Sequence, residues 1–140
     1  MDLGEQAQIQ GVRFRDSDGL VKELSKTGED LVIEIRYRTN RRIESPVFGI
    51  AICGPNGVHL SSFNTKRNSY KMDAIEGEGT LYCRLLDIPF RDGIYLLTIS
   101  LRDKDNKLYY DFHNRRYRFE VTCNEEHTAG IFLLQREWSA

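Results

Sequence analysis

Turn-forming residues recur about every ten residues along much of this chain, and this spacing limits the possible fold more than any other feature of the sequence. The turn segments are Asp16-Ser17-Asp18-Gly19, Lys26-Thr27-Gly28-Glu29, Gly54-Pro55-Asn56-Gly57, Arg91-Asp92-Gly93 and Asp103-Lys104-Asp105-Asn106. Gly, Asn and Asp are favoured in tight turns because they tolerate backbone conformations that other residues avoid. Turns at such short, regular intervals are typical of an all-β chain.

Apolar and polar residues alternate between these turns. In residues 31–38 the apolar set is Ile33, Ile35 and Tyr37, and the residues between them are charged. This period of two is the pattern of a strand with one buried face. Further candidate strands are residues 9–14, 48–53, 58–63, 81–86, 95–102, 107–110, 117–121 and 131–134. Since no window sustains a capped helical stripe, the sequence predicts an immunoglobulin-like antiparallel β-sandwich of about eight or nine strands.

The length of 140 residues suits one domain. We therefore expect a single β-sandwich over residues 1–140, with a flexible stretch at residues 1–8 and loops at residues 64–79 and 124–130. The segment Asp92-Gly93-Ile94-Tyr95 resembles the tyrosine corner of immunoglobulin-like sandwiches.

The last predicted strand follows a polar linker, so it either folds back on its own sheet or is exchanged with a partner chain. In the second case the interface residues are Ile131, Phe132, Leu133 and Leu134.

Several functional classes lack their sequence signals. The three cysteines have no C-x-x-C spacing, so we expect no metal and no cofactor. Nucleophile motifs and a phosphate-binding P-loop are absent, which argues against an enzyme. A formal net charge of −1 argues against nucleic-acid binding through bulk electrostatics. The apolar runs are too short for a membrane span, and the N-terminus has no secretory signal.

Arginines and outward polar residues are the candidate binding groups. If Tyr95 and Leu97 point inward, then the alternate residues of that strand form an outer row, next to a strip of small residues, Val47, Gly49 and Ala51. Arginine forks suit carboxylates and phosphates, whereas hydroxyls and a tyrosine suit a neutral sugar. The alternative is that the basic clusters solvate a strand face and guard an exposed edge. The candidate ligand-binding residues are Arg36, Arg38, Tyr82, Thr98, Ser100, Arg102, Arg116 and Arg118.

A string of short motifs gives the chain a family resemblance. These motifs are Gly28-Glu29-Asp30-Leu31-Val32-Ile33, Pro46-Val47-Phe48-Gly49-Ile50-Ala51-Ile52, Gly57-Val58-His59-Leu60, Asn64-Thr65, Asp92-Gly93-Ile94-Tyr95 and Phe119-Glu120-Val121. In this order they resemble the C-terminal domain of Wzt, the ATPase subunit of ABC transporters that export O-antigen polysaccharide.

The resemblance implies a non-catalytic carbohydrate-binding module that recognises the modified non-reducing end of an O-antigen polysaccharide. It also implies a homodimer. Contact with the transporter's membrane subunit would run through an ATPase domain, which the missing P-loop indicates is not part of this sequence. The location would be cytoplasmic, at the inner face of the bacterial inner membrane, without direct membrane insertion. An immunoglobulin-like protein-interaction module without glycan specificity is the alternative. A hydrolase would need two carboxylates facing one cleft, and no spacing in the sequence indicates such a pair.

Overall fold

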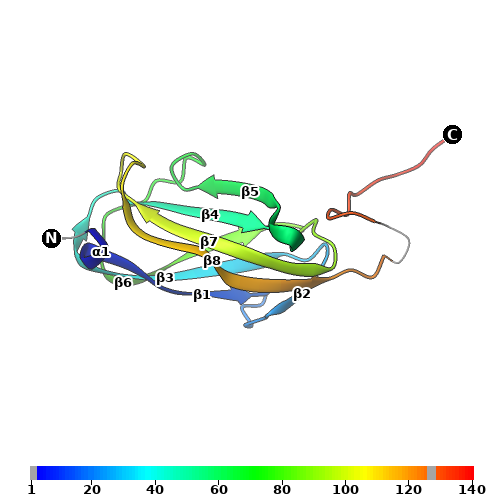
Figure 1. Ribbon diagram of the computed structural model, residues 1–140, viewed down its shortest axis with the longest axis horizontal. Coiled ribbons are helices and arrows are strands. Elements are labelled where there is room, and N and C mark those ends of the chain that lie inside the picture. The colour runs from blue at the N-terminus through cyan, green and yellow to red at the C-terminus, as the bar shows by residue number, and fades with distance from the viewer. Residues whose placement is uncertain (1–2, 126–128) are drawn as a thin grey trace.

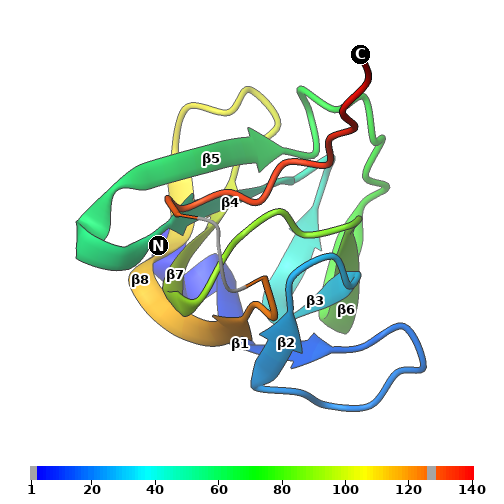
Figure 2. The same cartoon turned by 90° about the vertical axis from the view of Figure 1, so that its right-hand side faces the viewer.

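The structure is a computed structural model that describes residues 3–125 and 129–140. The described elements, in chain order, are α1 (Leu3–Gln6), β1 (Ala7–Arg15), β2 (Leu24–Lys26), β3 (Leu31–Ile43), β4 (Val47–Cys53), the 3₁₀ turn η1 (Pro55–Gly57), β5 (His59–Asn64), β6 (Ile75–Leu85), β7 (Gly93–Arg102) and β8 (Tyr109–Thr122). They form a three-stranded sheet of order β1-β3-β6 and a five-stranded sheet of order β2-β8-β7-β4-β5. The two sheets pack as a sandwich, so the predicted all-β fold is confirmed (Figures 1 and 2).

The core lies between the two sheets and is built from the alternating residues. Ile33 and Ile35 of β3 and Leu97 and Ile99 of β7 are fully buried. Tyr37 is only half-buried, and its ring lies 5.5 Å from that of Phe48 across the sandwich. Period-two burial on both sheets is what positions the outward residues of β7 on a single face.

Tyr95 fixes the start of β7. Its hydroxyl donates a hydrogen bond to the Arg91 carbonyl at 2.7 Å, which is the contact of a tyrosine corner. The Tyr95 ring stacks between Phe90, at 4.8 Å, and Phe119, at 5.4 Å between ring centroids. The tyrosine corner expected at residues 92–95 is therefore present in the structure.

The boundaries differ from the expectation in several places. Of the stretch 1–8, which we expect to be flexible, residues 1 and 2 lie outside the described part of the chain, and residues 3–8 form α1 and the start of β1, with Ala7 buried. The loop expected at residues 64–79 is shorter, because β6 begins at Ile75. The strands predicted at residues 107–110 and 117–121 fall in one strand, β8, which begins only at Tyr109. The loop expected at residues 124–130 includes residues 126–128, which lie outside the described part of the chain.

Among the described residues, the C-terminal segment makes backbone hydrogen bonds to the sandwich only near residues 131–133. The Arg91 amide donates to the Ile131 carbonyl at 2.7 Å, and the Leu133 amide donates to the Pro89 carbonyl at 2.6 Å. A single bridge at Phe132 therefore replaces the strand expected at residues 131–134. Beyond it the chain leaves the sandwich as an extended tail (Figure 1).

No described helix is long and apolar enough to cross a membrane.

Candidate functional site

The outward row of β7 lies beside the small residues of β4, as the alternation predicts. Thr98 pairs with Ala51, and Ser100 pairs with Gly49. A Cβ atom added to Gly49 would lie 2.5 Å from the Ser100 Oγ atom and 3.8 Å from the Asn64 Cβ atom. Glycine at this position therefore keeps the surface hollow between β5 and β7.

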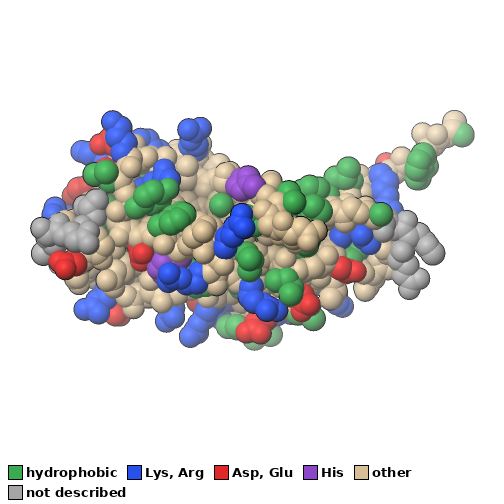
Figure 3. All heavy atoms as spheres, in the orientation of Figure 1, with side chains coloured by type: hydrophobic (Ala, Val, Ile, Leu, Met, Phe, Trp, Pro, Cys, Tyr) green, Lys and Arg blue, Asp and Glu red, His purple; other side chains and the backbone are tan. Residues whose placement is uncertain are grey.

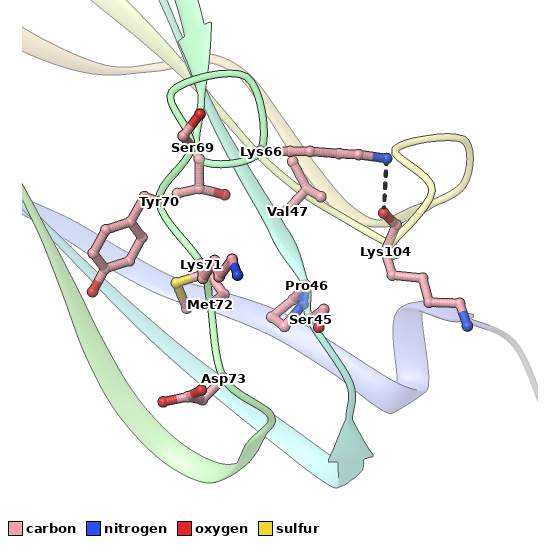
Figure 4. A pocket seen from close by; sticks show the side chains of 11 residues that line it. Ser45, Pro46, Val47, Lys66, Ser69, Tyr70, Lys71, Met72, Asp73 and Lys104 are labelled. Atoms are coloured by element: carbon pink, nitrogen blue, oxygen red, sulfur yellow. Dashed lines mark hydrogen bonds between the residues drawn. The ribbon is translucent and has the colours of Figure 1, made fainter.

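Val47 was expected to face outward with these small residues, but it is buried. The loop after β5 covers it. Figure 4 shows Lys66 passing beside Val47 and reaching the Lys104 carbonyl, to which its ammonium group donates a hydrogen bond at 3.1 Å. This bond joins the loop after β5 to the turn between β7 and β8.

A groove of about 650 Å³ runs over the small residues and the outer row of β7. Its lining comes from β4, β5, β7, β8 and the two segments that Lys66 joins. Pockets of roughly 300–1,000 Å³ are typical of small-ligand sites. Hydrophobic and basic side chains lie next to one another on the face shown in Figure 3.

Two aromatic rings stand on the β8 side of the groove. Tyr109 and Phe112 are 42% and 46% exposed, and their ring centroids lie 5.0 Å apart. Exposed rings at a groove offer an apolar surface on which the C–H face of a sugar can stack. The five-stranded sheet holds both residues next to β7, because Tyr109 pairs with Arg102 and Phe112 pairs with Ser100.

Three asparagines contribute amide groups to the polar part of the lining. The Oδ1 atom of Asn64 accepts from the Arg67 amide at 2.8 Å, that of Asn106 accepts from Arg102 at 3.3 Å, and that of Asn114 accepts from Thr98 at 3.3 Å. Within residues 3–125 and 129–140 their amide nitrogens have no protein acceptor, so each amide can donate to a ligand oxygen.

Arg102 is held in a fixed position. Its guanidinium carbon lies 4.1 Å from the centroid of the Tyr109 ring, and its nitrogens donate to the Tyr109 hydroxyl and to Asn106. Its Nε atom is buried and has no hydrogen-bond partner in the described part of the chain.

A bulge in β8 positions Arg115 at the other end of the groove. Arg115 has a positive φ of 49°, and its amide donates to the Thr98 Oγ1 atom at 2.9 Å. Its guanidinium group donates to the Gly57 carbonyl at 3.4 Å.

The structure brings together only part of the predicted site. Thr98, Ser100 and Arg102 line the groove. Arg118 pairs with Leu96 farther along the same sheet, and Arg116 lies in the β8 bulge, and neither belongs to the groove lining.

The other predicted residues lie in the three-stranded sheet. Arg36 and Arg38 of β3 and Tyr82 of β6 are exposed in the sheet opposite the one that carries the groove. Arg38 pairs with Glu78 and Arg36 pairs with Thr80.

Sequence reasoning missed most of the groove lining outside β7. Tyr109 and Phe112 belong to the run Tyr109-Tyr110-Asp111-Phe112, whose density of aromatic residues directly after a turn was a usable signal. Arg67 and Asn106 gave no such signal, since both lie in turns that are also rich in other polar residues.

The pocket drawn in Figure 4 is a weaker candidate. Its volume is about 520 Å³, and its lining includes Lys66, Lys71, Lys104 and Asp73. Of these, Lys66 donates to a backbone carbonyl, and the lining lacks a pair of neighbouring exposed rings such as Tyr109 and Phe112. The groove over β7 offers the better combination of apolar and hydrogen-bonding surface.

In β8, Asp111, His113 and Tyr117 form a cluster with the residue types of a catalytic triad. Its contacts hold the two sheets together and do not face the groove. The Nε2 atom of His113 lies 3.1 Å from the Asp111 carboxylate, and its Nδ1 atom lies 2.6 Å from the Tyr117 hydroxyl. Asp111 also accepts the Ile9 amide at 2.8 Å, which ties β8 to β1 across the sandwich. Burial lowers the pKa of His113, against the opposing effect of Asp111. None of these side chains lines the groove.

The described residues contain no group of three or more His, Cys, Asp or Glu side chains that could hold a metal ion.

An immunoglobulin-like sandwich with an open groove on its five-stranded sheet defines a class of binding domain. Comparison with protein families narrows this class, because the Wzt C-terminal domain family matches residues 4–134. The chain belongs to this family. Its members are carbohydrate-binding domains of an ABC transporter, and they form the non-ATPase part of Wzt, so the expectation of a non-catalytic domain is confirmed.

Solved structures support the fold. The crystal structure of a Wzt C-terminal domain matches with a TM-score of 0.79 and 14% identity, over 96% of this chain and 84% of that chain. An alkylpurine DNA glycosylase from Pseudomonas fluorescens matches with a TM-score of 0.52 and 12% identity, over 84% of this chain and 30% of that chain. At these identities the likeness concerns the fold alone. No curated protein matches the chain.

Proposed function

We propose that the groove over β4, β7 and β8 binds the modified non-reducing end of an O-antigen polysaccharide and thereby selects finished chains for export by an ABC transporter. The observation that carries this proposal is the exposed pair Tyr109 and Phe112 beside a hollow that Gly49 keeps open. Stacking rings, amide donors and a row of hydroxyls form the combination that a sugar needs, because sugars present C–H faces and hydroxyl edges.

In this reading the domain binds the glycan and does not cleave it. Its place is the cytoplasm, at the inner face of the inner membrane, where the ATPase subunit of the transporter works. Contact with the membrane subunit runs through the ATPase domain, and the groove remains free for the end of the polysaccharide.

The experiment is a binding titration by calorimetry with O-polysaccharides that carry or lack their terminal modification. Ala51→Phe fills the groove, because Ala51 lies between Thr98 and Ser62 in the pairing of β4 with β7 and β5. Thr80→Phe adds the same ring to an exposed position of the other sheet, beside Arg36.

We expect binding only to the modified end, loss of binding in Ala51→Phe, and unchanged binding in Thr80→Phe. Loss of glycan binding in Thr80→Phe alone would instead place the binding site at Arg36, Arg38 and Tyr82. Absence of binding by the folded chain to either polysaccharide would instead support a protein-interaction module.

We also propose a homodimer formed through residues 131–134. The observation that favours it is the exposure of Leu134 and Trp138, at 70% and 95%, on a tail whose backbone bonds to the sandwich, among the described residues, are those of Ile131 and Leu133. Light scattering after size-exclusion chromatography should give the mass of a dimer for the full chain and of a monomer after deletion of residues 131–140. A monomeric full chain would refute the dimer. A truncated chain that remains dimeric would show that the interface does not involve residues 131–140.

A further inference from the structure

The charged side chains of the groove are all basic. Arg67, Arg102 and Arg115 line it, and no aspartate or glutamate of the described residues does. This bias is local, because the whole chain has 20 basic residues against 21 acidic ones. A cavity lined by one sign of charge concentrates ligands of the opposite sign.

Some arginines elsewhere in this fold are neutralised by acidic partners, and the groove arginines are not. Arg15 forms an ion pair with Glu34 at 3.1 Å, and Arg84 forms one with Asp30 at 2.7 Å. Among the described residues, no carboxylate forms an ion pair with Arg67, Arg102 or Arg115. Their positive charges are therefore available to a ligand.

Arg102 shows the contrast most clearly. Its strand partners are Val47 and Tyr109, whereas Arg38 on the opposite sheet lies across from Glu78. The contacts of Arg102 with Tyr109 and Asn106 involve only neutral groups, and they fix the guanidinium plane before any ligand arrives. A fixed and unneutralised guanidinium beside exposed rings is suited to bind an anionic group on a stacked sugar.

The two ends of the groove are too far apart to share one small anion. Arg102 and Thr98 are four residues apart in β7, a span of about 13 Å, and Arg115 lies at the Thr98 end. Arg67 belongs to the Arg102 end, since it follows Asn64, whose partner on β4 is Gly49. The ring pair Tyr109 and Phe112 lies beside Arg102, so this end combines stacking with charge.

We propose that the recognised end of the glycan carries an anionic substituent, a phosphate, sulfate or carboxylate, which Arg102 and Arg67 bind while the sugar ring stacks on Tyr109 and Phe112. This inference rests on the proposed function, which it deepens by naming the chemical class of the end group. The interior of the glycan then extends along β7 toward Thr98 and Arg115.

The test is an array of oligosaccharides that differ only in a neutral, phosphorylated, sulfated or carboxylated non-reducing end. We expect the chain to bind anionic ends in preference to the neutral end, and to lose affinity as salt is added. Arg102→Gln and Arg67→Gln should each weaken binding of the anionic end by about tenfold, which is typical for a charge-assisted contact. Arg38→Gln is the matched control, because it removes the same charge from the opposite sheet and should change nothing.

Equal binding of neutral and anionic ends, unaffected by Arg102→Gln and Arg67→Gln, would overturn the anion proposal. If Ala51→Phe still abolished that binding, the glycan-binding function would stand without it. If Arg102→Gln does not fold, Arg67→Gln still tests the proposal, because the Arg67 side chain lies in a surface turn.

A second measurement separates the two proposals when no glycan on the array binds. Titration of the ¹⁵N-labelled chain with inorganic phosphate and with sulfate, followed by NMR, reports on the anion site without a sugar. Shifts centred on Arg67, Arg102 and Asn106 support the anion site although the glycan proposal has failed. Shifts that are absent, or spread over both sheets, refute the anion site as well.

Discussion

Replacing Phe112 by alanine should weaken glycan binding several-fold while the chain stays folded. A fully buried aromatic side chain covers roughly 200 Å². With 46% of Phe112 exposed, about 90 Å² remain for a ligand to cover. A sugar ring that covers half of this area gains ~1.1 kcal/mol at ~25 cal/mol per Å², which corresponds to about a sixfold change in Kd. Because about half of the Phe112 side chain is already exposed, the sandwich should tolerate the change, and the loss of the contact with Tyr109 should lower the free energy of unfolding by about 1 kcal/mol.

The assay is calorimetric titration of the Phe112→Ala chain, with urea denaturation to follow stability. Phe112→Tyr keeps a ring at the same position and should retain binding. Tyr82→Ala is the control, because Tyr82 is 60% exposed in the other sheet. Unchanged affinity in Phe112→Ala together with weaker binding in Tyr82→Ala would refute the stacking argument and would favour the opposite face.

Three further predictions concern the fold. Ile99→Ala should lower the free energy of unfolding by about 2–5 kcal/mol, measured in urea, because Ile99 is fully buried between the sheets; a loss below 1 kcal/mol contradicts the sandwich core. Tyr95→Phe should lose about 1 kcal/mol in the same assay, since it removes the hydrogen bond to the Arg91 carbonyl. Burial lowers the pKa of His113 in the folded chain, so the unfolded chain binds the proton more readily. The free energy of unfolding should therefore be highest above about pH 6.5 and should decrease as the pH drops below that value. His113→Gln should flatten that slope in thermal unfolding at several pH values, and an equally steep slope assigns the effect to other groups.

The fold could be predicted because its information is local. Alternation in residues 31–38 and 95–102 marks the buried face of β3 and β7 without any knowledge of their neighbours. By contrast, β2 has only three residues, too few to show a period, and it is defined by its parallel pairing with β8. The continuity of β8 through the bulge at Arg115 also depends on pairing, because the polar residues around it look like a turn in the sequence.

The site could be predicted only along one strand. Alternation places Thr98, Ser100 and Arg102 on the outer face, but it does not say which sheet each strand joins. Arg36 fits the same pattern as Arg102 and lies in the other sheet. Tyr109 and Phe112 enter the groove through their register with β7, which is a property of the assembled sheet and not of their own segment.

The exposed tail has a consequence for optical measurements. Trp138 is the only tryptophan of the chain, and it lies in the tail at 95% exposure, away from both the core and the groove. Its fluorescence should therefore remain that of a solvated indole when a glycan binds, and it should change little when the sandwich unfolds. If the tail packs against a second copy, the indole leaves water and its emission shifts to the blue as the protein concentration rises. The one natural fluorophore of this kind thus reports on association between chains and is insensitive to recognition of the ligand.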